Sequence, residues 1–360
     1  PRRHSPSRPQ MSRTDYFLRR LLLVVPTFIG ITMLCFAITQ FVPGGPVDQM
    51  MMRMHGMGSG GESVAGGPSS GSASQESMER EREAFRKHFG FDQPLLKRYW
   101  KWFWTERCGM LTRSYKFTNK TAWEMISQRF PVSLAFGITS FILTYLVCIP
   151  LGVAKALRHG GTFDMVSSVI VFTGYAIPVF ALGMLLKMLF CGTVESLWDL
   201  FPATGFHSPG YEGLPFWEKA WDIVWHMLLP IACYMAGSFA MLTLLMKNSL
   251  LEQINSDYVR TVYAKGGSAR RAVWCHALRN ALIPIATGFG GILSVMFAGS
   301  VIIERVFEIP GMGNLSMEAI VGRDYPVFMG ILALTSILTL IGDILSDFCY
   351  VIIDPRIHFN

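Results

Sequence analysis

Long apolar stretches constrain this chain more than any other feature of its sequence. They lie at 21–42, 132–157, 165–190, 222–246, 281–303 and 327–352. A helix needs about 20 apolar residues to cross the hydrocarbon core of a bilayer, where every backbone polar group must be paired within the protein. Charged residues make up only 16% of the chain, against roughly 25% in soluble domains. The sequence therefore predicts an all-α polytopic membrane protein with six transmembrane helices.

Lysine and arginine in the short loops predict the orientation, because loops rich in these residues stay in the cytoplasm. The basic residues on one side are Arg13, Arg19, Arg20, Lys155, Arg158, Lys247, Arg260, Lys265, Arg270, Arg271 and Arg279. The other side has only Lys219 in 191–221, and Arg305 and Arg323 beside several acids in 304–326. The segments 1–20, 247–280 and 353–360 are predicted to be cytoplasmic. The net charge of +7 is thus explained by topology and does not indicate nucleic-acid binding.

The interval 43–131 is predicted to be a long external insertion, too long for the charge rule to apply. Its Gly-, Ser- and Met-rich part, 52–78, is predicted to be disordered. Residues 1–10 are expected to be non-native or disordered. The interval also holds an aromatic stripe at helical spacing, formed by Leu96, Tyr99, Trp100, Phe103 and Trp104. This helix is suited either to the membrane interface or to packing inside a small external domain. The run Thr121–Glu124 is a capping box that predicts the start of another short helix, leading towards Phe130.

The segment 247–280 is polar yet helical in pattern. Leu251, Ile254, Tyr258 and Val262 are spaced to share one helix face, and Gly266 and Gly267 are suited to ending that helix. Ser268 is a cap residue for a second helix through Leu278. Its predicted apolar stripe is Val273, Trp274, Ala277 and Leu278. The pattern favours two helices joined at a glycine corner, and a solvated basic loop is the alternative.

Several kinds of chemistry have no signature in this chain. There is no P-loop and no H-E-x-x-H, and the seven cysteines lack metal-binding spacing. Gly67–Gly71 matches G-x-S-x-G formally, but its low-complexity setting argues against a nucleophile elbow. Lys187 and His226 are expected near the outer ends of their segments, and Asp343 and Asp347 are expected to face the cytoplasmic interface. These absences count against a membrane enzyme and against a proton-coupled carrier.

Several motifs resemble one family of transport proteins. They are Arg19–Leu23, Pro43–Pro46, Phe89–Pro94, Ile149–Gly152, Gly174–Pro178, Asp257–Gly266, His276–Pro284, Pro310–Gly313 and Asp354–Ile357. Together they resemble the B-type permease subunits of binding-protein-dependent ABC importers of the dipeptide, oligopeptide and nickel group. Residues 44–49, the insertion after them and Ser346–Tyr350 are most similar to the Yej-type oligopeptide (microcin C) importers.

The resemblance implies a type I ABC importer permease fold in the bacterial inner membrane. It implies a second permease subunit, expected to be a different chain, two ATPase subunits, a solute-binding protein and a peptide substrate, with lipid around the spans. ATP and magnesium would bind the partner ATPases, so no cofactor, metal or catalytic residue is expected here. A stand-alone secondary carrier or channel for small solutes is the alternative function.

Two functional surfaces are expected, and the resemblance implies the first of them. The first is an ATPase-coupling set consisting of Asp257, Tyr258, Arg260, Thr261, Val262, Ala264, Lys265, Gly266, Gly267, His276 and Arg279. His276–Arg279 departs from the general importer motif, a departure that the peptide group shares. The second surface is predicted from the external position of its residues and from the unusual aromatic side chains there, rather than from the resemblance. It is an external gate or binding-protein docking set consisting of Trp100, Trp104, Glu304, Glu308, Pro310, Gly311 and Gly313.

Overall fold

The computed structural model describes residues 13–41, 83, 93–117, 119–192, 198–287 and 300–353. The part of the chain so described is helical, and its only β-structure is two isolated bridges, Arg113 with Thr121 and Cys191 with Asp199. The predictions for 1–10, 52–78 and 67–71 lie outside the described residues. The chain divides into two compact units, one of residues 1–25, 129–315 and 337–360, the other of 26–128 and 316–336.

The described helices include four that are long and apolar enough to span a membrane. They are α1 (Arg13–Phe41), α5 (Ala122–Leu157), α8 (Phe216–Ile254) and α16 (Tyr325–Ile353). The pair α6 (Thr162–Ala176) and α7 (Val179–Phe190) meets the same criteria jointly but is bent by 98°. The break lies at Ile177 and Pro178, because a proline disfavours helical backbone at the residue before it, whereas Gly174 stays within α6. Residues 288–299 of the predicted fifth segment lie outside the described part.

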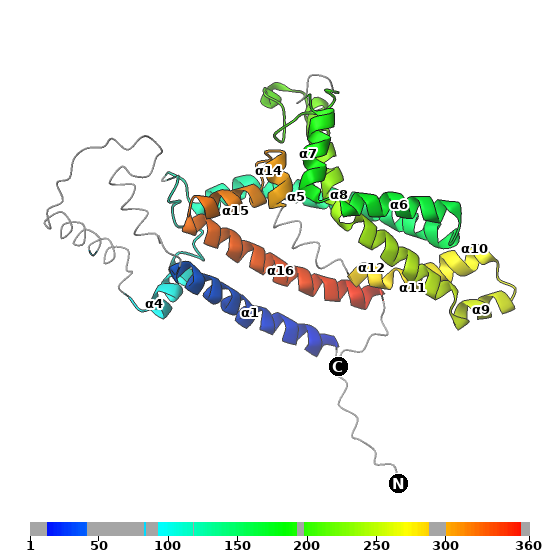
Figure 1. Ribbon diagram of the computed structural model, residues 1–360. Coiled ribbons are helices and arrows are strands. Elements are labelled where there is room, and N and C mark those ends of the chain that lie inside the picture. The colour runs from blue at the N-terminus through cyan, green and yellow to red at the C-terminus, as the bar shows by residue number, and fades with distance from the viewer. Residues whose placement is uncertain are drawn as a thin grey trace, which may run out of the picture. The chain divides into compact units, whose positions relative to one another are not determined.

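The first unit carries a series of short helices after α8. They are α9 (Asp257–Ala264), α10 (Ala269–Arg271), a π-helical segment (Ala272–Ala277), α11 (Leu278–Ala281) and α12 (Ile283–Thr287). Figure 1 shows these helices, in yellow, gathered at the carboxyl end of α8. Further along the chain, α14 (Val301–Val306) packs on α7 and α8.

The second unit has its own core. There α4 (Leu95–Trp100) continues into a π-helical segment (Lys101–Thr105), and α15 (Met312–Val321) enters the unit at Ser316. Tyr99 and Trp102 are buried against Phe36 and Met329, and the Tyr99 hydroxyl lies 2.9 Å from Thr32 Oγ1. This packing favours the interpretation of the aromatic helix as part of a small packed domain.

The capping box at Thr121 is confirmed, because Glu124 N donates to Thr121 Oγ1 and Thr121 N donates to Glu124 Oε2, at 3.2 and 3.0 Å. The prediction that the helix after it is short was wrong. One helix, α5, runs from Ala122 to Leu157 through Pro131. A proline removes one backbone hydrogen bond from a helix but does not have to end it, and the chain stays helical on both sides of Pro131.

Candidate coupling site

The glycine corner begins with a break between two helices. α8 ends at Ile254, and α9 starts after Ser256, whose extended backbone interrupts the helix. The carbonyl of Ser256 accepts hydrogen bonds from Val259 N and Arg260 N, at 3.2 and 3.3 Å. The prediction of one helix through Leu251 and Val262 was therefore wrong. The spacing alone could not reveal the break, since Asn255 and Ser256 are polar positions in either arrangement.

Gly266 ends α9 in the left-handed conformation that the sequence predicts, with φ +78°. Gly266 N donates to Tyr263 O at 2.9 Å, and Gly267 N donates to Val262 O at 3.0 Å. This pair of bonds is a Schellman motif, which satisfies carbonyls that the end of a helix leaves unpaired. A Cβ on Gly266 would have no heavy atom within 4 Å, whereas one on Gly267 would lie 2.7 Å from Val262 Cγ1. Gly266 therefore faces open space, and Gly267 packs tightly on the helix.

The second limb of the corner begins at Ser268, as predicted. Its Oγ accepts from Arg271 N at 3.4 Å, and the chain stays helical through the π-helical segment. Val273 and Ala277 are buried as expected, but Trp274 is 52% exposed and Ala272 is buried in its place. The wider turn of a π-helix shifts which residues face inward, so the prediction that Trp274 is on the buried stripe was wrong.

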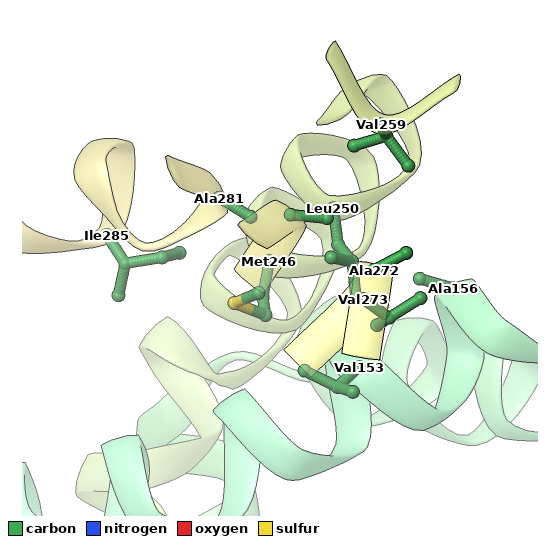
Figure 2. Packing of buried hydrophobic residues seen from close by; sticks show 10 residues of the cluster. Val153, Ala156, Met246, Leu250, Val259, Ala272, Val273, Ala281 and Ile285 are labelled. Atoms are coloured by element: carbon green, nitrogen blue, oxygen red, sulfur yellow. The ribbon is translucent and has the colours of Figure 1, made fainter. Parts of the chain in front are cut away.

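A buried apolar cluster forms the base of the corner and is shown in Figure 2. We call it the coupling cluster, and its members are Val153, Ala156, Met246, Leu250, Val259, Ala272, Val273, Ala277, Ala281 and Ile285. It joins α5, α8 and both limbs of the corner. Close approach at Gly152 tightens the joint, because a Cβ there would lie 2.6 Å from Met246 Cβ. The Ser249 hydroxyl donates to Ala281 O at 2.9 Å and closes the base.

The structure brings the predicted coupling residues together around this corner. Most of them are exposed: Asp257, Tyr258, Arg260, Thr261, Ala264, Lys265, Gly266, His276 and Arg279. Val262 and Gly267 are half-buried. Tyr263 and Trp274 are exposed aromatic residues of the same corner that the sequence did not place in the coupling set. Tyr263 could have been found as an aromatic residue outside the predicted stripes, whereas the helical spacing had assigned Trp274 to the buried stripe. The corner is thus an exposed surface of aromatic and basic side chains on a rigid apolar base.

The predicted external set is divided between buried and exposed residues. Glu304 is fully buried, and its carboxylate accepts from Ser133 Oγ at 2.9 Å and Asn314 N at 2.7 Å. Glu304 is therefore not part of an exposed docking surface, and its place at an external gate stays a prediction. Burial raises the pKa of the Glu304 carboxyl, while the hydrogen bonds from Asn314 N and Ser133 oppose that shift. The Glu304 carboxylate lies in the interior because it pairs with a backbone N–H group in the first turn of α15, which would otherwise have no partner.

The glycines of the same turn fit around Glu304. A Cβ on Gly311 would lie 2.5 Å from the Glu304 carboxylate, and one on Gly313 would lie 2.7 Å from Val301 N. Pro310 is partly exposed, and the Glu308 side chain is 68% exposed. Trp100 and Trp104 are also exposed, in the second unit, with Trp104 at 70%. Pro310, Glu308 and the two tryptophans are therefore accessible, whereas Glu304, Gly311 and Gly313 shape the turn from inside.

Comparison with known proteins gives consistent matches over most of the chain. Residues 148–359 match the family described as binding-protein-dependent transport system inner membrane component. The chain is 38% identical to the peptidoglycan transport system permease protein YejB of Agrobacterium fabrum, over 96% of this chain and 98% of that protein. It is 38% identical to the inner membrane ABC transporter permease protein YejB of Escherichia coli O157:H7, over 96% and 99%. It is 33% identical to the dipeptide transport system permease protein DppB of Escherichia coli K12, over 96% and 98%.

Proposed function

Because this chain belongs to the family of inner membrane components of binding-protein-dependent transport systems, we propose that it is one permease subunit of an ATP-driven importer of peptides. The names of two relatives refer to peptidoglycan and to dipeptides, and short peptides are common to both kinds of cargo. The importer would move dipeptides or oligopeptides from an external binding protein into the cytoplasm.

The proposed assembly contains this chain, a second permease subunit of different sequence, two ATPase subunits and a solute-binding protein. The chain crosses the membrane six times with both termini in the cytoplasm, and 43–131, 191–221 and 304–326 lie outside. It performs no catalysis, and ATP and magnesium bind the ATPase partners. The charge distribution of the short loops and the apolar lengths of the described spans support this arrangement.

The exposed corner around Gly266 is the observation that carries the proposal. The sequence contains no P-loop, so free energy from ATP must reach this chain through contact with another protein. The corner offers that contact, since it presents Tyr258, Tyr263 and Trp274 to solvent from a fixed backbone. Aromatic side chains on a rigid support are typical of the central contacts of protein interfaces.

The coupling cluster gives the corner a mechanical connection to the membrane spans. Val259 in α9 and Val273 in the second limb pack with Val153 of α5 and Leu250 of α8. Protein interiors are close-packed and do not deform smoothly, so displacement of the corner displaces the ends of α5 and α8 with it. An ATPase that changes shape against the corner can therefore tilt the spans.

In the predicted external region, Glu304 holds the turn Pro310–Gly313 against α5 through Ser133. We place the external gate at this turn and the docking of the binding protein at Trp100 and Trp104. Glu304, Gly311 and Gly313 act there by shaping the turn, and Glu308 and Pro310 form its accessible part. The exposure of large aromatic rings supports a partner at the tryptophans.

The test is transport by the reconstituted complex. Proteoliposomes holding this chain, its permease partner and the ATPases are loaded with ATP, and binding protein with labelled peptide is added outside. A panel of dipeptides, longer peptides and peptidoglycan fragments is compared. We expect uptake that requires both internal ATP and the binding protein. Uptake by this chain alone without ATP would overturn the proposal and support a stand-alone carrier.

A further inference from the structure

Three charged side chains meet where α5, α6 and α8 come together beside the coupling cluster. Lys247 Nζ of α8 lies 2.8 and 2.7 Å from the two carboxylate oxygens of Asp164, in the first turn of α6. Lys155 Nζ of α5 lies 3.2 Å from Asp164 Oδ1. Asp164 is therefore the common counter-ion of two lysines from two other helices.

The group is buried and fully organised. Lys155 has no exposed surface, and its ammonium also donates to Asp164 O at 3.0 Å, Ser167 Oγ at 2.8 Å and Ser168 Oγ at 2.7 Å. The Asp164 carboxylate accepts from Gly160 N at 3.2 Å as well. The exposed imidazole of His159 lies 3.4 Å from it. Removing one member of a buried ionic group leaves an uncompensated charge, so these side chains hold each other in place.

In sequence, the two lysines are neighbours of coupling-cluster residues on the same helices. Lys155 lies between Val153 and Ala156 on α5, and Lys247 directly follows Met246 on α8. Within the described residues, α6 contributes no side chain to that cluster. Asp164, Ser167 and Ser168 of α6 make polar contacts with these two lysines of α5 and α8.

We propose that Asp164 is a positioning residue for ATP coupling, which makes the first half of the bent pair α6–α7 follow the coupling corner. When the corner moves α5 and α8, the two lysines carry the start of α6 with them. Because α6 and α7 meet at a 98° bend, movement of α6 can change the angle at that bend. This inference rests on the proposed function for its transport readout.

The test compares three variants in the reconstituted complex. Asp164→Asn removes the counter-ion, and Asp164→Asn combined with Lys247→Met restores the parental net charge of the group without restoring the bridge. Glu252→Gln is the matched control, since it removes an exposed carboxylate from the same end of α8. Membrane level, bound ATPase, ATP hydrolysis and peptide uptake are measured for each variant.

We expect peptide uptake per ATP hydrolysed to fall at least about fivefold in Asp164→Asn, the lower end of typical coupling between sites. If Asp164→Asn lowers the amount of protein in the membrane, the double variant should restore that amount, but its uptake per ATP hydrolysed should stay low. Glu252→Gln should match the parent in both measurements. A parental ratio of uptake to ATP hydrolysis in the double variant would overturn the inference, because it would show that only the net charge of the group matters and not the ionic bridge. If the parent itself shows no ATP-dependent uptake, the proposed function fails instead, so the two failures are distinguishable.

Discussion

Substitution at Gly266 separates two reasons why the corner needs glycine. A residue other than glycine in the left-handed region costs roughly 1–2 kcal/mol, and asparagine and aspartate tolerate this region better than other residues. Two contributions oppose this strain. The two backbone hydrogen bonds of the Schellman motif stabilise the corner by about 0.5–1.5 kcal/mol each, and burial of Val259 stabilises it by about 1.5–3 kcal/mol. The corner is therefore expected to stay folded in Gly266→Ala, Gly266→Asn and Gly266→Asp.

What differs among these variants is the side chain in the open space beside Gly266. If an ATPase occupies that space, Gly266→Asn and Gly266→Asp should lose more uptake than Gly266→Ala, although they are less strained. We expect Gly266→Asp to abolish uptake and detach or uncouple the ATPases, while the variant accumulates normally and still pairs with its permease partner. If only backbone strain mattered, Gly266→Ala would be the most impaired.

The assay is co-purification of the ATPases together with ATP-dependent peptide uptake. Gly210 supplies a matched control, because it has φ +88° and no heavy atom within 4 Å of an added Cβ, yet lies in the predicted external loop. Gly210→Asp should leave the ATPases bound. Parental transport by Gly266→Asp with ATPases attached would refute the assignment of the coupling contact, even though the family would stand.

Three further predictions address topology, docking and the outer turn. Ser70→Cys should react with an impermeant thiol reagent added outside intact cells and Ser268→Cys should not; the reverse pattern would invert the orientation. Replacing Trp100 and Trp104 with serine should weaken uptake from the binding protein and leave the ATPases bound, whereas unchanged uptake at normal protein levels would assign the rings a structural role. Glu304→Gln should lower the free energy of unfolding by about 1–3 kcal/mol, because a side-chain amide cannot accept hydrogen bonds at both positions as the carboxylate does; an unchanged melting temperature of the purified protein would contradict this.

The sequence was most informative where a single local rule decides the outcome. The end of α9 at Gly266, the cap at Ser268 and the bend near Pro178 each depend on the conformational limits of one residue type. The presence of the apolar helices α1, α5, α8 and α16 was equally readable, because a span needs about 20 apolar residues, but α5 and α8 extend beyond the predicted segments 132–157 and 222–246.

The sequence was least informative where the partners are distant along the chain. Asp164 and Lys247 are 83 residues apart, and Ser133 and Glu304 are 171 apart. No local pattern predicts such pairs, so Lys247 was interpreted only as a marker of topology and Glu304 as a surface acid. The predicted burial of Trp274 was wrong for a different reason. A π-helical turn changes the angular spacing of side chains, and the residue types give no signal of such a turn.

The length of α8 determines how far its two ends move relative to each other when it tilts. With 39 residues and a rise of about 1.5 Å per residue it is about 58 Å long, so a tilt of about 5° moves one end by roughly 5 Å relative to the other. Its carboxyl end, at Met246 and Leu250, is fixed in the coupling cluster, and its amino end follows the loop that precedes Phe216. In the proposed importer, a small rotation of the corner would therefore be amplified along α8, so that a chain without a nucleotide site of its own could still open a passage.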